Sequence, residues 1–461
     1  MSSASRRNLK VGVSGVRGVV GETLSPMLAS DFAASFGAFS GRGSIIVGRD
    51  TRPSGEMLEN AVVSGLLASG SMVLLAGIVP TPTLQIAVRK YEAAGAIAVT
   101  ASHNPSEWNA LKFIDSSGYF LTGSGMNALL DIYNQPQNDS VPESAFRKIG
   151  SISDAFETHM NLILDRVDVK LIRKAGFKVA VDCCNGVGAL FSEYFLRKLG
   201  CAEVFPIFTE PSGCFERKPE PTAANLTALC ETVKSNGCDI GFAQDPDGDR
   251  ISTVDETGTP LGEQYSTLIP AEHILSRTPG PVVANIQTTR ALGDIAARFK
   301  SPIFYSKVGE INVAAEMLRR KAVYGAEGGS GGVMWNAIHP CRDSFSAMAL
   351  TLEALALRKM KVSEIIGTYP HYYSAVRKLE TDAQSAHAAL QMMAQKYASE
   401  KPILLDGIRL DLGDSWVLAR QSNTEAVIRI HAESTRSRNA AQETAERILR
   451  ELKEWTGKDL E

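Results

Sequence analysis

The stretch AIAVTASHNPSEWNALKF, residues 96–113, decides the fold class. It opens with a short run of small and β-branched residues, typical of a buried strand, and a polar turn at 101–105 ends that strand. Similar apolar runs recur at 44–48, 72–76, 177–182, 239–243 and 281–286. Amphipathic segments of helix length separate them, at 27–39, 187–199, 225–235, 290–299 and 311–320. Strand–helix alternation of this kind predicts mainly parallel sheets covered by helices.

The alternation recurs in three blocks, and 461 residues are enough for about three or four domains. The polar stretch 134–151 and the segment 255–260 are the expected boundaries between blocks. From about residue 373 the pattern changes, because strand-like runs at 403–412 and 416–421 follow each other closely and one helix, 438–455, closes the chain. We expect α/β domains with mixed, mostly parallel sheets at 1–148, 149–256 and 257–370, and a smaller α+β domain at 371–461.

Composition excludes several classes of protein. Lys and Arg total 48 against 51 Asp and Glu, so the net charge of −3 offers no general field for nucleic acid or an anionic membrane. The seven cysteines are odd in number and form no C-x-x-C pair, so we expect reduced thiols in a cytoplasmic protein. The first residues contain no apolar segment typical of a secretory signal. The uncharged stretch 60–88 is interrupted at 69–71 and ended at 80–82, so we interpret it as a helix and a buried strand rather than a membrane span.

The polar turn at 101–105 carries residues that suit phosphate chemistry. Ser102 stands at the carboxyl end of the expected strand, beside His103 and close in sequence to Lys112. A serine in such a place can be a nucleophile or a phosphate carrier. The alternative is an ordinary loop in which Ser102 and Asn104 cap the next element. The turn alone leaves both interpretations open.

The stretch GFAQDPDGDRISTVDETG, residues 241–258, predicts a metal site. Asp245, Asp247 and Asp249 repel one another unless a cation neutralises them. An EF-hand is excluded, because its sixth position requires glycine and is Arg250 here, and strand-like runs flank the loop. Since no Cys or His stands nearby in the sequence, we expect Mg²⁺ or Mn²⁺ and not zinc. A non-catalytic Ca²⁺-binding module remains the alternative.

Two further stretches offer groups that could bind a ligand. The glycine run GAEGGSGGV, residues 325–333, lets the backbone approach a ligand closely, although a flexible loop has the same composition. The segment RQSNTEAVIR, residues 420–429, gathers hydroxyl, amide and guanidinium donors that suit a phosphate dianion, and an ordinary polar hairpin turn is its alternative. Its donors are Arg420, Ser422, Asn423, Thr424 and Arg429.

Taken together, motifs along essentially the whole chain resemble those of the α-D-phosphohexomutase family, which includes phosphoglucomutases, phosphomannomutases and phosphoglucosamine mutases. The serine turn TASHNP (100–105) and the metal loop DPDGDR (245–250) are the most specific of them. The others follow in the family's order: VSGVRG (13–18), VGRDTRPSG (47–55), KVGE (307–310), GAEGGSGG (325–332) and RQSNTE (420–425).

The resemblance implies three related α/β/α domains and a smaller C-terminal domain around a central cleft. It implies an intramolecular phosphotransferase in which phosphorylated Ser102 exchanges its phosphoryl group with a hexose phosphate through a sugar 1,6-bisphosphate, which also serves as activator. Ser102 and the three aspartates would hold one Mg²⁺ per chain. Arg17 and Arg250 would stabilise the phosphoryl oxygens in transit, and Lys112, ahead of His103, would move protons.

The resemblance also assigns the remaining site residues. Contacts to the sugar would come from Gly309, Glu310, Glu327 and Ser330. Contacts to the non-reacting phosphate would come from Arg420, Ser422, Asn423, Thr424 and Arg429. The expected partner is a hexose or hexosamine phosphate, with no nucleic acid and no membrane, and the expected assembly is a monomer or a homodimer.

The chain departs from the family's usual pattern at both recognition loops. Two residues separate Glu327 from Ser330, and Gly332 stands where histidine is usual, a form that resembles phosphoglucosamine mutases or archaeal-type phosphomannomutases. In the phosphate loop, Gln421 and Asn423 replace a proline and a glycine. We therefore place phosphoglucosamine mutase first, acting between glucosamine 6-phosphate and glucosamine 1-phosphate. A phosphomannomutase/phosphoglucomutase is the alternative, and a metal-dependent sugar phosphatase is a remote one.

Overall fold

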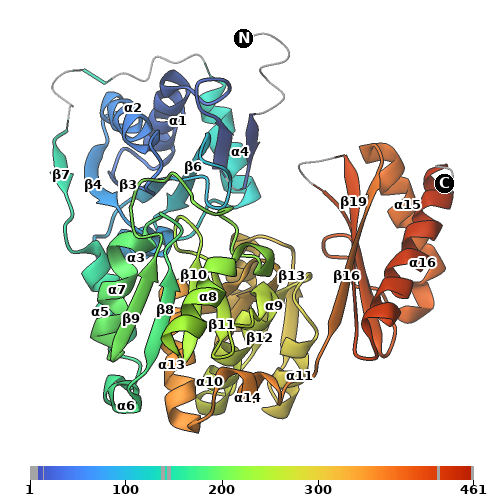
Figure 1. Cartoon of the computed structure of the whole chain (residues 1–461). Helices are drawn as coiled ribbons and strands as arrows, with labels where there is room; N and C mark the ends of the chain where they lie inside the picture. The colour runs from blue at the N-terminus through green and yellow to red at the C-terminus, as the bar shows by residue number, and fades with distance from the viewer. Residues whose placement is uncertain (1–8, 14, 136–140, 143–146, 423–425, 458–461) are drawn as a thin grey trace.

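Figure 1 shows the computed structural model of the chain, which describes residues 9–13, 15–135, 141–142, 147–422 and 426–457. Three α/β units, coloured from blue to orange, form the main body, and a smaller C-terminal unit lies beside it. Each unit has its own sheet with helices packed against it. This architecture confirms the expected fold class, while the domain limits at 148, 256 and 370 stay predictions.

The first unit is built on a mixed sheet. Its strands lie in the order β1 (Lys10–Gly12), β2 (Gly15–Val19), β6 (Trp108–Asp115), β5 (Gly95–Val99), β3 (Ser44–Arg49), β4 (Met72–Ile78) and β7 (Ile149–Ser151). Strands β3, β4, β5 and β7 are parallel, whereas β6 pairs antiparallel with β5, β2 with β6 and β1 with β2. The helices are α1 (Pro26–Phe39), α2 (Gly55–Ala68), α3 (Thr81–Lys90) and α4 (Gly123–Tyr133).

The second and third units contain four-stranded sheets. In the second unit the strand order is β11 (Ile251–Asp255), β10 (Ile240–Gln244), β8 (Lys178–Asp182) and β9 (Glu203–Ile207). In the third unit it is β13 (Ile303–Ser306), β12 (Val282–Asn285), β14 (Tyr324–Glu327) and β15 (Gly332–Trp335). The helices of the second unit are α5 (Ala155–Leu164), α6 (Val169–Ala175), α7 (Gly188–Leu199), the 3₁₀ turn η3 (Ala223–Asn225) and α8 (Thr227–Asn236). Those of the third are α9 (Gly262–Ser266), α10 (Leu268–Arg277), α11 (Ala291–Arg298), α12 (Glu310–Arg320), the 3₁₀ turn η4 (Gly328–Ser330), α13 (Ser344–Arg358) and α14 (Val362–Ile366).

The three sheets share one topology. In each, the first strand of a repeating set lies between the second and the third, and all three are parallel (β3, β4, β5; β8, β9, β10; β12, β13, β14). A fourth strand then pairs antiparallel with the third, as β6, β11 and β15 do. The central strands are almost fully buried, because helices cover both faces of such sheets. Loops that leave the carboxyl ends of parallel strands are where ligands bind in α/β sheets, so this repeat indicates where to look for the site.

The C-terminal unit is an antiparallel sheet covered on one face by helices. Its strands lie in the order β16 (Tyr373–Glu380), β19 (Val427–Ser434), β18 (Ser415–Gln421) and β17 (Ile408–Asp411). Helix α16 (Arg438–Thr456) closes the chain close to its predicted limits, but helix α15 (Ala383–Lys396) and the turn η5 (Ala398–Glu400) were not predicted. The predicted strand at 403–412 is shorter, because only its second half pairs with β18.

Most of the other predicted elements are confirmed within a few residues. The uncharged stretch 60–88 is the end of α2, strand β4 and most of α3, so it is indeed a helix followed by a strand. In the described part of the chain, no helix is both long enough and apolar enough to cross a membrane. All seven cysteines are free thiols, and most are buried, although Cys214 is exposed.

Candidate active site

Ser102 lies in a tight turn between β5 and β6. Its φ of +50° is a left-handed conformation that a residue with a side chain rarely adopts, so the surrounding structure must hold it there. Its amide donates to the Thr100 hydroxyl at 3.0 Å, and its Oγ donates to Oδ2 of Asp245 at 2.7 Å. Nδ1 of His103 lies 3.4 Å from the same Oγ. The turn therefore aims the Ser102 hydroxyl at the loop that carries the predicted metal ligands.

Asp245, Asp247 and Asp249, hereafter the acidic triad, follow the carboxyl end of β10. One ligand oxygen from each lies within 4.8 Å of the others, and all three residues are buried. The loop joins the antiparallel strands β10 and β11, not two helices, which agrees with the exclusion of an EF-hand. Glu256, the twelfth residue counted from Asp245 and so the place of an EF-hand's last ligand, instead accepts hydrogen bonds from the amide and hydroxyl of Ser363.

The acidic triad fits a divalent cation. Oδ1 of Asp247 and Oδ1 of Asp249 are buried, and neither has a hydrogen-bond partner among the described residues. A buried acceptor without a donor is costly, and two of them on ionisable groups call for a cation. An all-oxygen set of this kind is the one that Mg²⁺ prefers.

The three carboxyl groups do not share one electrostatic environment. Burial, together with the charges of Asp249 and Asp247, raises the pKa of Asp245 well above its usual range. Burial alone would raise the pKa of Asp247 too, but the Lys112 ammonium, 2.7 Å from its Oδ2, lowers that pKa below the usual range. The Thr81 hydroxyl donates to the same oxygen at 2.8 Å. Lys112, which comes from β6, thus links the first unit to the metal loop of the second.

Two arginines predicted for phosphoryl transfer line the same cavity. Arg17 donates from Nη1 to Oδ1 of Asn104 at 2.6 Å, and burial and the charge of Arg250 lower its pKa to about 10. Arg250 donates to Glu220, while its buried Nε, 3.8 Å from Oδ2 of Asp245, has no hydrogen-bond partner among the described residues. Cations with donors unused at a cavity wall can receive an anionic oxygen.

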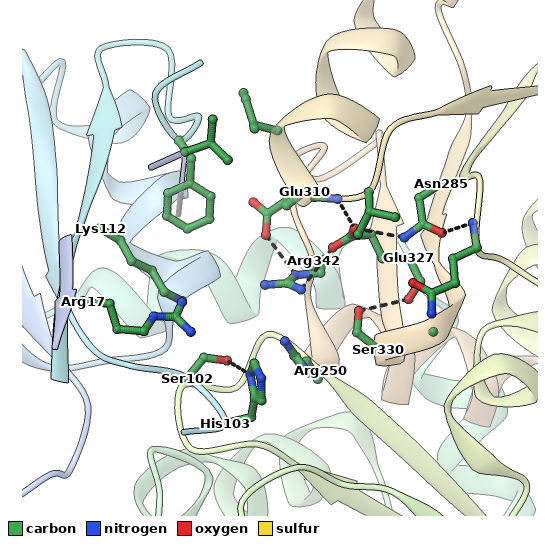
Figure 2. Close-up of a pocket in the computed structure, with 17 residues that line it drawn as sticks. Arg17, Ser102, His103, Lys112, Arg250, Asn285, Glu310, Glu327, Ser330 and Arg342 are labelled. Carbon is green, nitrogen blue, oxygen red and sulfur yellow. Dashed lines mark hydrogen bonds and ion pairs between the residues drawn. The ribbon is translucent and has the colours of Figure 1, made fainter. Parts of the chain in front are cut away.

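Figure 2 shows Arg17, Lys112 and Ser102 on one side of the cavity and Glu327 and Asn285 on the other. Oε1 of Glu327 accepts from the Asn285 amide at 3.0 Å and from the backbone N–H of Gly309 at 2.7 Å. Gly309 has a φ of +115°, which favours glycine at this position. Ser330 lines the same wall and donates to the Glu327 carbonyl at 3.1 Å. The two predicted sugar loops therefore meet at the carboxyl ends of β13 and β14.

Arg342 lines the same cavity, and sequence reasoning noted it in the Arg342-Asp343 pair after the glycine run but gave it no role. Its guanidinium donates to Oδ2 of Asp249 at 2.5 Å, to Oε2 of Glu327 at 3.1 Å and to Oε2 of Glu310 at 3.2 Å. Glu310 also accepts from Gln85 at 2.8 Å, and burial raises its pKa to about 7 against the opposing charge of Arg342. That pair does not specify the three carboxylates that the guanidinium contacts.

The described residues of the predicted phosphate loop, Arg420, Ser422 and Arg429, do not line this cavity. Arg420 and Arg429 are paired across β18 and β19, so both project from one face of the sheet. Nη1 of Arg420 lies 3.4 Å from Oδ2 of Asp406, which also accepts from the backbone N–H of Val308 in the sugar-loop region at 3.1 Å. Ser422 is buried at the end of the described part of the loop. Asn423 and Thr424 lie outside the described residues.

Comparison with protein families gives four matches in chain order. They carry the descriptions "Phosphoglucomutase/phosphomannomutase, alpha/beta/alpha domain I" at residues 8–140, domain II at 157–258, domain III at 262–373, and C-terminal domain at 375–451. Together they span nearly the whole chain.

Individual proteins match over the same length. A protein of Thermococcus kodakarensis named "Phosphoglucomutase/phosphomannomutase" is 35% identical over 96% of this chain and 98% of its own. A protein of Pyrococcus abyssi named "Probable phosphoglucosamine mutase" is 32% identical over 95% of this chain and 97% of its own. The crystal structure of a phosphoglucomutase/phosphomannomutase family protein from Burkholderia thailandensis superposes with a TM-score of 0.86 at 27% identity and covers both chains completely.

Proposed function

Because the chain belongs to the phosphoglucomutase/phosphomannomutase family, we propose that it interconverts the 6-phosphate and the 1-phosphate of a hexosamine or hexose through a phosphate carried on Ser102. The family consists of intramolecular phosphotransferases, so the chain is an enzyme of that class. One observation carries the assignment of the reacting group. The Ser102 Oγ lies 2.7 Å from a carboxylate of the acidic triad, at one wall of a cavity whose other wall holds Glu310 and Glu327.

The proposed reaction has two transfers. In the first, the bond between phosphorus and Ser102 Oγ breaks, a bond forms to the free hydroxyl of the sugar monophosphate, and the hydroxyl proton passes to a base on the enzyme. The resulting 1,6-bisphosphate reorients in the cavity, so that its other phosphate faces Ser102. In the second transfer its other phosphate returns to Ser102 and the released sugar oxygen receives a proton. Added bisphosphate would activate the enzyme by phosphorylating any unmodified Ser102.

Charge stabilisation supplies much of the catalysis in such transfers. A Mg²⁺ held by the acidic triad and Ser102 would neutralise negative charge at the serine oxygen. The chain's own cations, Arg17 and Arg250, would donate to the equatorial oxygens of the phosphoryl group from the cavity wall. Lys112 would keep Asp247 ionised and aligned through their 2.7 Å contact.

Proton transfer would fall to His103 and Lys112. Burial, with the charges of Arg250 and Arg17, lowers the pKa of His103 to about 2, so its imidazole is neutral near neutral pH and has a lone pair to accept a proton. Lys112 forms an ion pair with the acidic triad and as an ammonium has protons to donate. An imidazole with so low a pKa is a weak base near neutral pH, so we keep the order that the resemblance implies, with Lys112 ahead of His103 as the group that moves protons.

The non-reacting phosphate needs a receptor that serves both orientations of the bisphosphate. Arg420, with Ser422, Asn423, Thr424 and Arg429 around it, is the proposed receptor. Its face of the C-terminal sheet carries Trp416 and Leu418, which pack against Ile286 of the third unit. Closure of the C-terminal unit over the cavity would bring Arg420 towards the sugar, as domain closure does in many enzymes.

For the sugar, we propose glucosamine first and mannose or glucose second. The name of the Pyrococcus abyssi relative supports glucosamine, and the carboxylates of Glu310 and Glu327 on the sugar wall suit an ammonium group. The Thermococcus kodakarensis relative, whose name specifies glucose and mannose phosphates, supports the second.

A substrate panel tests both levels of the proposal. Glucosamine, mannose and glucose 6-phosphates are offered with Mg²⁺ and a catalytic amount of the matching 1,6-bisphosphate, and 1-phosphate formation is compared by kcat/KM. Peptide mass spectrometry follows the phosphate on Ser102 before and after addition of excess sugar monophosphate. Full turnover by Ser102→Ala would contradict the relay, and release of inorganic phosphate without isomerised sugar would indicate a phosphatase instead.

A further inference from the structure

The motif VGRDTRPSG, residues 47–55, has no role in the reaction as described so far. It forms the end of β3 and the turn into α2, and Arg52 in this turn is completely buried. The Arg52 guanidinium donates to four backbone carbonyls, three in the turn that carries Ser102 and one in the first residue of β6, which follows that turn. They are Ser102 at 2.7 Å, Asn104 at 2.6 Å, Pro105 at 2.6 Å and Trp108 at 3.1 Å.

Asp50 connects the same guanidinium to the other side of the serine turn. Its Oδ2 accepts from Arg52 Nε at 3.0 Å and from the Thr100 hydroxyl at 2.6 Å. The oxygen of that hydroxyl in turn accepts the Ser102 amide at 3.0 Å. Ser102 is thus held at both its carbonyl and its amide by one continuous set of buried hydrogen bonds, which defines what we call the serine cradle: Asp50, Arg52 and Thr100.

The cradle is also joined to the metal loop. The Thr51 hydroxyl donates to the Asn185 carbonyl at 2.8 Å. The next residue, Gly186, lies so close to Pro246 that an added Cβ would stand 2.5 Å from its Cα, and the Val187 amide donates to the Pro246 carbonyl at 2.9 Å. The turn that carries Thr51 and Arg52 in the first unit is therefore linked, through Asn185 and Gly186, to the backbone between Asp245 and Asp247 in the second unit.

This arrangement is more specific than structural support requires. A buried arginine that only stabilised the fold could donate to any neighbouring carbonyl, yet every carbonyl to which Arg52 donates lies in the serine turn or in the first residue of β6 directly after it. Only a planar guanidinium has the fork of donors that four converging carbonyls need, so lysine could not reproduce it. The cradle also acts on a residue whose left-handed φ is unfavourable by itself.

We propose that the serine cradle positions Ser102, so that Arg52, Asp50 and Thr100 are positioning residues for phosphoryl transfer. The inference rests on the proposed function of Ser102 and adds the reason why its Oγ meets the acidic triad. Loss of the cradle would let the serine turn relax, and a displacement of about 1 Å at a reacting atom can reduce the rate by about 100-fold.

Thr100→Val is the sharpest test, because it replaces the hydroxyl by a methyl group and removes both cradle bonds at that residue. The phosphoenzyme is mixed with sugar monophosphate, and the single-turnover rate of phosphate loss from Ser102 is measured with KM and melting temperature. We expect a transfer rate lower by about 100-fold with KM within about twofold of the wild type. Thr100→Ser, which keeps the hydroxyl, should restore most of the rate, and Arg52→Lys should lower it at least as far as Thr100→Val.

Thr351→Val is the matched control, since Thr351 is equally buried and its hydroxyl donates to a backbone carbonyl within α13, at 2.8 Å. It should lower stability with little effect on transfer. The inference would be overturned if Thr100→Val transferred phosphate at the wild-type rate, or if Thr100→Ser lost as much as Thr100→Val. Absence of phosphate from Ser102 in the wild-type enzyme under turnover would instead refute the proposed function itself.

Discussion

Replacement of Arg342 by lysine is the perturbation that probes the cavity most directly. Arg342 joins three carboxylates from three separate segments: Asp249 of the acidic triad, Glu310 at the start of α12 and Glu327 at the end of β14. Lysine keeps the positive charge but presents one nitrogen in place of three. We expect that nitrogen to stay with Asp249, the shortest of the three contacts, which leaves Glu310 and Glu327 without their shared cation.

The size of the effect follows from those contacts. The Arg342 side chain is 11% exposed and its three partners are 4% exposed or less, so solvent screens these ion pairs little. Hydrogen bonds to charged groups are each worth about 1.5–3 kcal/mol, so loss of two of them costs about 3 kcal/mol at the lower end. These contacts exist in the free enzyme too, so about 3 kcal/mol is the largest loss of transition-state stabilisation we expect, which corresponds to a kcat/KM lower by at most about 150-fold.

The assay is steady-state isomerisation of the preferred sugar phosphate, in both directions, by Arg342→Lys and the wild type. Because Glu310 and Glu327 belong to the sugar wall, we expect KM to rise together with the fall in kcat. Arg277→Lys is the control for the exchange itself, since Arg277 is half exposed and forms a single ion pair with Glu353 at 2.7 Å. If Arg342→Lys kept kcat/KM within about fivefold of the wild type with its fold intact, the assignment of Arg342 as the link between the two walls would be wrong.

Three further predictions test the metal site, the phosphate receptor and the buried histidine between the first and third units. EDTA should abolish activity and Mg²⁺ restore it, and each Asp→Asn change in the acidic triad should lower kcat by orders of magnitude; full turnover after chelation would exclude the metal. Arg420→Ala should weaken kcat/KM by about 2–3 kcal/mol in both directions, and a defect in one direction alone would contradict a shared receptor. Burial lowers the pKa of His339 to about 4. Since the unfolded side chain binds its proton near pH 6.5, the free energy of unfolding should fall as the pH drops, by about 2 kcal/mol at pH 5. In urea titrations His339→Gln should remove this pH-dependent loss of stability, whereas the exposed His387→Gln should not.

The fold class could be predicted because its signals are local. Apolar runs such as 44–48 and 239–243 are short, β-branched and followed by polar turns, so each identifies a strand without knowledge of its neighbours. Helix α15 was missed for the opposite reason. Its buried face consists of Ala386, Ala389 and Met393, and alanines give little contrast between a buried and an exposed face. Its Asp382 cap, which accepts from two amides, was the available signal.

The same distinction between local and distant signals applies to the residues of the candidate site. Residues of the serine turn and the metal loop could be proposed from sequence because crowded carboxylates or a strand-end serine imply their chemistry wherever they occur. Nothing in the sequence around Arg342 or Arg52 specifies their partners, because those partners are carbonyls and carboxylates 15 to 93 residues away for Arg342 and 50 to 56 residues away for the four carbonyls at Arg52. Such contacts join segments far apart in the sequence, within the first unit for Arg52 and also between the third and second units for Arg342 with Asp249, and local patterns do not encode them.

The contrast between Ser102 and Arg52 shows what this means for the chemistry. Sequence could place a hydroxyl at the end of β5 and carboxylates at the end of β10, and the rule that ligands bind at the carboxyl ends of parallel strands makes both face a common cleft. That rule has a precision of several ångströms, whereas phosphoryl transfer needs the reacting oxygen in place to well under one. The remaining precision comes from groups with no reactive role of their own: a buried guanidinium on four carbonyls, and a threonine hydroxyl between Asp50 and the Ser102 amide. Positioning residues are therefore the part of an active site that a single sequence conceals most completely, and the part that a structure is needed to identify.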